Sequence, residues 1–207
     1  MNPVSPYTDL RAWLDHNWPV YLDLLHQLVA INSFTFNPAG VNRLGELTAE
    51  RFAPLGFEAE AIPADGFRYG RHLVLERRGR RGPDGKPAPV LGLISHLDTV
   101  FPEAEERAND FRFRIAGDRI YGPGTVDIKG GTVMMYLVLD GLRHFYPEVF
   151  EGVTWRILLN AAEEVLAPDF GDLARERLGG ALAALVFEGG DVVDGRYLLV
   201  TARKGMA

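Results

Sequence analysis

The chain has 207 residues, 47% of them hydrophobic and 24% charged, which is the composition of a globular protein that can bury a full core. The net charge of −6 argues against nucleic acid and anionic membranes as partners, because both attract basic surfaces. The absence of cysteine excludes disulfides and restricts any metal site to His, Asp and Glu ligands.

Helical patterns come first along the chain. No signal-peptide pattern precedes them, and no apolar run approaches the roughly 18 residues of a membrane span, so we expect a cytoplasmic protein without a membrane partner. Residues 8–31 carry hydrophobic residues at helical spacing, with Thr8 as the N-cap and a break at Pro19. A further helix is predicted over residues 41–54, ending near Gly56.

Strands follow, and later alternate with helices. The predicted strands cover residues 57–62, 72–77, 90–95, 111–115, 119–121, 153–160, 183–187 and 197–202, and the predicted helices cover residues 132–145 and 169–178. The Gly- and Pro-rich segment 79–89 is typical of an exposed hairpin loop. The alternation predicts an α/β fold with helices on both faces of a sheet.

Side chains of metal-ligand type lie at the ends of these strands. They are His96 and Asp98 after residue 95, Glu163 and Glu164 after residue 160, Glu188 after residue 187, and Asp127 in a glycine-rich loop before a helix. Ligands of open α/β sheets bind at the carboxyl ends of the strands. Four such clusters therefore suggest one shared site.

Each cluster also has a simpler interpretation, which for Glu188 taken alone is that of a surface residue. Asp98 can fix the tautomer of a metal-binding His96, although a turn hydrogen bond without metal is favoured for this pair taken alone. Asp127 can bridge two metal ions or act as N-cap of the following helix. Of the adjacent Glu163 and Glu164, one can bind metal while the other holds a water, or both can be solvated.

Taken in order, the motifs resemble the M20 metallopeptidase family. Residues 95–102 (SHLDTVFP) are similar to that family's G-H-x-D-T-V-x-P, and residues 122–131 (GPGTVDIKGG) to its G-x-G-x-x-D-M-K-G-G. Glu163 and Glu164 stand where the family has D-E-E, with Ala162 in place of the Asp. Glu188 stands where it has a ligand carboxylate.

The resemblance implies a three-layer α/β/α sandwich with a mixed, mostly parallel sheet, and a two-metal-dependent hydrolase of amide bonds in peptides or N-acyl amino acids. The metal would be Zn²⁺, or Co²⁺ or Mn²⁺ in its place. Two such ions lower the pKa of a water and polarise the scissile carbonyl. The implied roles are His96 and Glu188 on the first metal, Asp127 bridging, Glu164 on the second, Glu163 as general base, and Asp98 behind His96.

The resemblance also implies a domain organisation. Residues 1–202 would form the N-terminal part of the catalytic domain, and residues 203–207, which start with the R-K-G segment, would begin the connection to an absent lid domain through which the family dimerises. The family's late His ligand has no counterpart, so we expect an incomplete, weakly active or inactive form. The alternatives are a non-catalytic binding or regulatory module that retains the metal-site loops, and an α/β domain with coincidental motifs.

Overall fold

The computed structural model describes residues 6–65 and 68–188. The predicted strand at 197–202 and the predicted boundary at 203 lie outside these residues. The elements are α1 (Pro6–Val29), α2 (Pro38–Phe52), β1 (Glu58–Pro63), β2 (Arg71–Arg77), β3 (Val90–His96), α3 (Glu103–Ala108), β4 (Arg114–Ala116), β5 (Arg119–Tyr121), α4 (Lys129–Phe145), α5 (Pro147–Gly152), β6 (Thr154–Asn160), α6 (Asp169–Leu178) and β7 (Ala183–Val186).

The main sheet has the strand order β1-β2-β6-β3-β7. The pairs β1–β2 and β2–β6 are antiparallel, whereas β3 runs parallel to both β6 and β7. The sheet is therefore mixed as predicted, but it is not mostly parallel. The expected hairpin across residues 79–89 is wrong, because β6 lies between β2 and β3. That segment instead connects two strands that are not neighbours.

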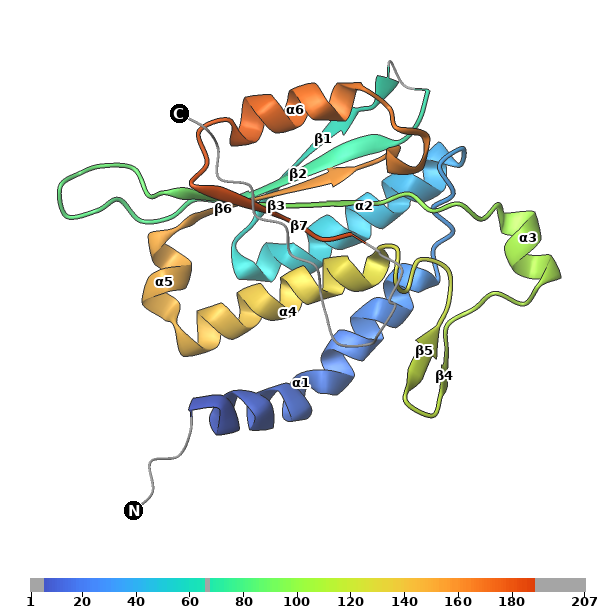
Figure 1. Cartoon of the computed structure of the whole chain (residues 1–207), viewed down its shortest axis with the longest axis horizontal. Helices are drawn as coiled ribbons and strands as arrows, with labels where there is room; N and C mark the ends of the chain where they lie inside the picture. Colours follow the sequence, from blue (N-terminus) through green and yellow to red (C-terminus); the bar gives the residue numbers. More distant parts are fainter. Residues whose placement is uncertain (1–5, 66–67, 189–207) are drawn as a thin grey trace.

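Helices cover both faces of this sheet and complete three layers, with α6 on one side and α1, α2 and α4 on the other (Figure 1). The alternation of strand side chains explains both contacts. On β2, Val74 packs with Leu158 and with Leu173 of α6. Leu73 and Leu75 point the other way, into the larger core beneath the remaining helices.

The first helix differs from its prediction at two points. The predicted break at Pro19 is wrong, because α1 continues through it, and Thr8 lies inside the helix rather than at its N-cap. A proline in a helix interior removes one backbone hydrogen bond. Burial of the opposite face of α1 against the core offsets that loss, through Tyr21, Leu24, Leu25 and Leu28.

Pro19 is exposed, so we expect Pro19→Ala to raise the free energy of unfolding by about 1–3 kcal/mol, since it restores helix propensity without removing core contacts. Urea denaturation followed by circular dichroism measures the change. Val20→Ala, at a neighbouring exposed position of the same helix, is the control and should change stability little. Equal or lower stability of Pro19→Ala would show that the proline is accommodated without cost.

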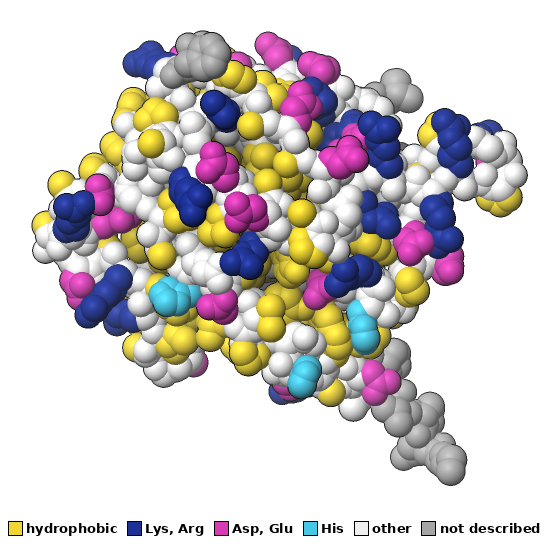
Figure 2. Space-filling view, turned by 180° about the vertical axis from the view of Figure 1, so that it is seen from behind, with side chains coloured by type: hydrophobic (Ala, Val, Ile, Leu, Met, Phe, Trp, Pro, Cys, Tyr) yellow, Lys and Arg dark blue, Asp and Glu magenta, His cyan; other side chains and the backbone are white. Residues whose placement is uncertain are grey.

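On the face shown in Figure 2, basic and acidic side chains are interspersed, without a patch of one sign. Among the described residues, no helix is both long enough and apolar enough to cross a membrane.

Candidate metal centre

Three strands of the sheet end at the same edge. The parallel register pairs His96, the last residue of β3, with Asn160, the last residue of β6. Beyond these ends, the Leu97 amide donates to the Asn160 carbonyl over 2.7 Å, and the Phe187 amide donates to the Ile94 carbonyl over 2.8 Å. The segments that carry Asp98, Glu163, Glu164 and Glu188 therefore leave the sheet side by side.

His96 lies at the centre of this edge with its side chain fully buried. Its Nε2 lies 2.8 Å from Asp127 Oδ1 and 3.5 Å from Glu188 Oε1. One ligand atom from each of the three residues falls within 4.8 Å of the others. One imidazole and two carboxylates at this spacing fit a divalent ion such as Zn²⁺, and they need no thiolate.

The carboxylates also determine the protonation of the imidazole. Burial alone lowers the pKa of His96, but hydrogen bonds to Asp127, Asp98 and Glu188 outweigh it and raise the pKa to about 12. The site thus strongly attracts positive charge. A metal ion would provide that charge in place of the proton.

Asp98 lies behind His96 and is itself completely buried. The Nδ1 atom of His96 is 3.0 Å from the backbone carbonyl of Asp98 and 3.3 Å from its carboxylate Oδ1, so the carbonyl is the nearer partner. Burial raises the pKa of Asp98, but hydrogen bonds with His96 and Thr35 lower it further than burial raises it. Thr35 was not predicted as part of the site; its hydroxyl donates to Asp98 Oδ2 over 2.7 Å.

The same carboxylate holds the segment that bears the two glutamates. Asp98 Oδ1 accepts from the Glu163 amide over 3.0 Å, and Oδ2 accepts from the Glu164 amide over 3.2 Å. Both glutamates begin a short 3-10 helix, Glu163–Val165, and are half-buried. Asp98 therefore links the imidazole to the backbone of both acidic residues.

Burial perturbs both glutamates. Burial, followed by the negative charge of Asp127, raises the pKa of Glu164 to about 7. Burial also raises the pKa of Glu163, with His96 acting in the opposite direction. Neither residue belongs to the group of three formed by His96, Asp127 and Glu188 among the described residues.

The loop that carries Asp127 is fixed by hydrogen bonds of Lys129, at the start of α4. The Lys129 amide donates to the Gly124 carbonyl over 2.7 Å, and its buried ammonium donates to the Ile31 carbonyl over 2.8 Å. Gly124 has φ +73°, and a Cβ there would lie 2.9 Å from Thr99 Cγ2, so the turn requires glycine. The interpretation of Asp127 as a helix N-cap is wrong, because Ile128 occupies that position of α4.

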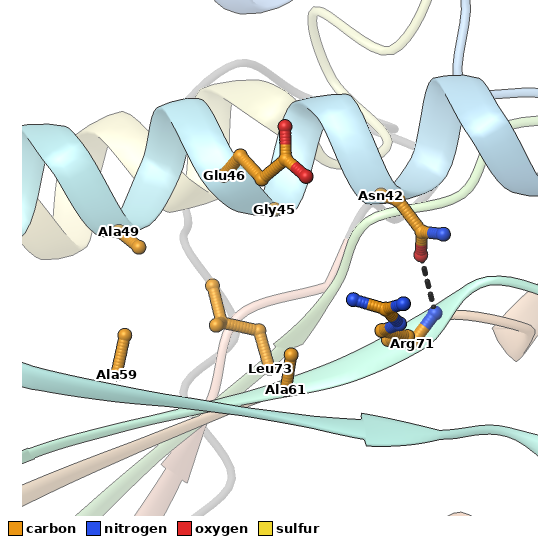
Figure 3. A pocket seen from close by; sticks show the side chains of 8 residues that line it. All are labelled: Asn42, Gly45, Glu46, Ala49, Ala59, Ala61, Arg71 and Leu73. Atoms are coloured by element: carbon orange, nitrogen blue, oxygen red, sulfur yellow. Dashed lines mark hydrogen bonds between the residues drawn. The ribbon is translucent and has the colours of Figure 1, made fainter.

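A separate cavity of about 190 Å³ lies between α2 and the strands β1 and β2. Figure 3 shows that small side chains leave it open, while the Asn42 side chain accepts from the Arg71 amide at one end. Its lining residues are Asn42, Gly45, Glu46, Ala49, Ala59, Ala61, Arg71 and Leu73. None of the predicted site residues lines this cavity.

The family-model match and the similar known proteins point to one family. The family model described as Peptidase family M20/M25/M40 matches residues 92–200. Carboxypeptidase G2 of Pseudomonas sp. (strain RS-16) is 29% identical over 184 residues, which is 89% of this chain and 42% of that protein. Succinyl-diaminopimelate desuccinylase of Thioalkalivibrio sulfidiphilus (strain HL-EbGR7) is 32% identical over 129 residues, 61% of this chain and 31% of that protein.

Solved structures support the fold. Human carnosine dipeptidase 1 superposes with a TM-score of 0.68 at 15% identity, covering 89% of this chain and 41% of that one. The chain thus spans less than half the length of the relatives that it matches.

Proposed function

Because the chain belongs to the peptidase family M20/M25/M40, we propose that it carries the metal site and the general base of a metal-dependent hydrolase of amide bonds in peptides or N-acyl amino acids. The observation that carries the proposal is the group of His96, Asp127 and Glu188, whose ligand atoms lie within 4.8 Å of one another. The match covers 42% of the length of carboxypeptidase G2, so the proposal concerns only the part of the catalytic machinery that lies in this chain.

The proposal has two divalent ions, with Zn²⁺ first and Co²⁺ or Mn²⁺ as substitutes, because imidazole and carboxylate ligands suit these metals. We assign His96 and Glu188 to one ion, Asp127 to a bridging position and Glu164 to the second ion. When bound, such ions polarise the scissile carbonyl and make a water more acidic. The pKa of Glu164, raised to about 7 by burial and then by Asp127, supports a nearby cation, which would relieve this repulsion.

We assign proton transfer to Glu163. A general base works best when its pKa lies near the working pH, and burial raises the pKa of this carboxylate towards that range. Glu163 would take a proton from water and return it to the leaving amine. Asp98 acts through its neighbours, because it fixes both the His96 ring and the Glu163 amide.

The chain is expected to bind Zn²⁺, and His96→Ala should lower the affinity at least about 100-fold, because it removes the central ligand of the group. Isothermal titration calorimetry on the metal-free chain measures both affinities. His16→Ala removes an exposed imidazole from α1 and should leave binding unchanged. Equal binding by wild type and His96→Ala, or no binding of Zn²⁺, Co²⁺ or Mn²⁺ by either, would overturn the proposed site.

The alternative function, a non-catalytic module that retains the metal loops, predicts the same metal binding. The two functions differ in whether the chain hydrolyses amide bonds. Turnover of N-acyl amino acids or dipeptides that requires metal would favour the hydrolase, even if the chain alone is slow. Metal binding without any turnover above background agrees with the module and equally with an incomplete hydrolase, because the chain spans 42% of carboxypeptidase G2.

A further inference from the structure

The segment that leads from β6 to the two glutamates is held at four successive backbone amides by side chains. The Ala161 amide donates to His72 Nδ1 over 3.1 Å, that of Ala162 to Asn160 Oδ1 over 3.0 Å, that of Glu163 to Asp98 Oδ1 over 3.0 Å and that of Glu164 to Asp98 Oδ2 over 3.2 Å. Such a run leaves little freedom for the backbone. Of the acceptors, His72 comes from β2, which carries no other residue of the site.

The partners of His72 determine its tautomer. A backbone N–H can only donate, so Nδ1 of His72 must be the unprotonated nitrogen that accepts from Ala161. The proton of the neutral ring then lies on Nε2, which is 3.2 Å from Asp169 Oδ2. The ring is therefore neutral, and it donates to Asp169.

Asp169 is in turn fixed at the start of α6. Its Oδ2 also accepts from the Asp65 amide over 2.6 Å, and its Oδ1 accepts from the Phe170 amide over 3.1 Å. His72 is 1% exposed and packs against the Phe170 ring. The imidazole thus spans from the first turn of α6 to the segment after β6, and packing leaves it one orientation.

We propose that His72 is a positioning residue for Glu163. Its Nδ1 holds the Ala161 amide where β6 ends, so that the chain enters the 3-10 helix with Glu163 beside His96, and Asp169 maintains the tautomer that allows this. Asp98 fixes the same segment from the opposite side, at Glu163 and Glu164. The proposal rests on the role of Glu163 proposed above, because His72 acts through its contacts with the Ala161 amide, Asp169 and Phe170, none of which is a proposed metal ligand.

Two substitutions separate the two ring nitrogens. Asparagine places its Oδ1 where Nδ1 of the ring lies, so His72→Asn keeps an acceptor for Ala161 and loses the contact with Asp169. Glutamine reaches the position of Nε2, so His72→Gln keeps the contact with Asp169 and loses the acceptor for Ala161. Both variants replace one buried ring by a neutral amide, which makes them matched controls for each other.

The first readout does not depend on activity. Amide hydrogen exchange of the metal-loaded chain, resolved by NMR, reports the Ala161 and Glu163 amides directly. We expect both amides to exchange at least about 10-fold faster in His72→Gln than in His72→Asn or wild type. Equal exchange of Ala161 and Glu163 in all three proteins would overturn the proposal.

The second readout is turnover with N-acyl amino acids or dipeptides. His72→Gln should lower kcat about 10- to 100-fold at unchanged KM and unchanged metal content, since small displacements of a reacting group have effects of this size. His72→Asn should restore most of kcat. If both variants instead lose kcat in proportion to their loss of melting temperature, His72 has only a structural role and the proposal is wrong.

The two readouts also separate this proposal from the proposed function. Absence of hydrolysis in the wild-type chain bears on the proposed function alone, while the exchange rates still decide whether His72 positions Glu163. Faster exchange in His72→Gln alone would support the positioning role in either case.

Discussion

Replacing Glu163 with glutamine is expected to lower metal-dependent amide hydrolysis by about 100- to 10,000-fold while the metal stays bound. Glutamine has the shape of glutamate but cannot take a proton from water. The backbone amide of residue 163 would still donate to Asp98, so the segment should keep its place. Steady-state turnover of N-acyl amino acids and dipeptides, together with metal analysis of the same samples, measures both effects.

Glu50→Gln is the matched control, since this exposed residue of α2 lies outside the site and should leave turnover unchanged. Loss of metal together with turnover in Glu163→Gln would make Glu163 a ligand instead of a base. Unchanged turnover would transfer the role of base to another group, and Glu164 would be the first candidate.

Asp98→Ala is expected to destabilise the fold by about 3–5 kcal/mol and to weaken metal binding by about 10- to 100-fold. Asp98 is fully buried and accepts from the Thr35 hydroxyl and from the amides of Glu163 and Glu164. Alanine would leave these donors without their acceptor, and His96 would lose a carboxylate 3.3 Å from its Nδ1. Chemical denaturation and Zn²⁺ titration measure the two losses.

Thr35→Val provides the control for this prediction. It removes one hydrogen bond to the same carboxylate at nearly constant volume, so it should cost about 1–2 kcal/mol and affect metal binding much less. A similar loss of metal affinity in both variants would mean that the general stability of the region, rather than the orientation of His96, determines binding.

Elements with a strong periodic pattern could be predicted closely from the sequence. The helix at 169–178 has the predicted bounds, because its apolar side faces the sheet through Leu173. The helix α3 was missed, since its sequence EAEERA contains no large hydrophobic residue and none of its residues is buried. The hairpin at 79–89 failed for another reason: the local pattern of β2 and β3 contains no information that β6 separates them.

The residues of the candidate site also fall into those that the sequence could predict and those that it could not. That His96, Asp127 and Glu188 lie together could be predicted, because ligand-type residues stood at strand ends and in a glycine-rich loop, which the fold places side by side. His72 and Thr35 could not, because each acts on a group that is distant in sequence. His72 meets an amide 89 residues away, and Thr35 meets a carboxylate 63 residues away. Neither contact leaves a motif.

The position of β6 also determines when the central strands can pair during synthesis. β2 and β3 are complete at His96, but the strand that joins them ends only at Asn160. During translation, at ~5–20 residues per second, both strands wait for seconds with an open edge, the state most prone to aggregate or to recruit chaperones. The strand β6, which joins β2 to β3, leads into Glu163 and Glu164, and β7 is added at the edge of the sheet later. A nascent chain therefore acquires its central sheet and its acidic pair in the same step of synthesis.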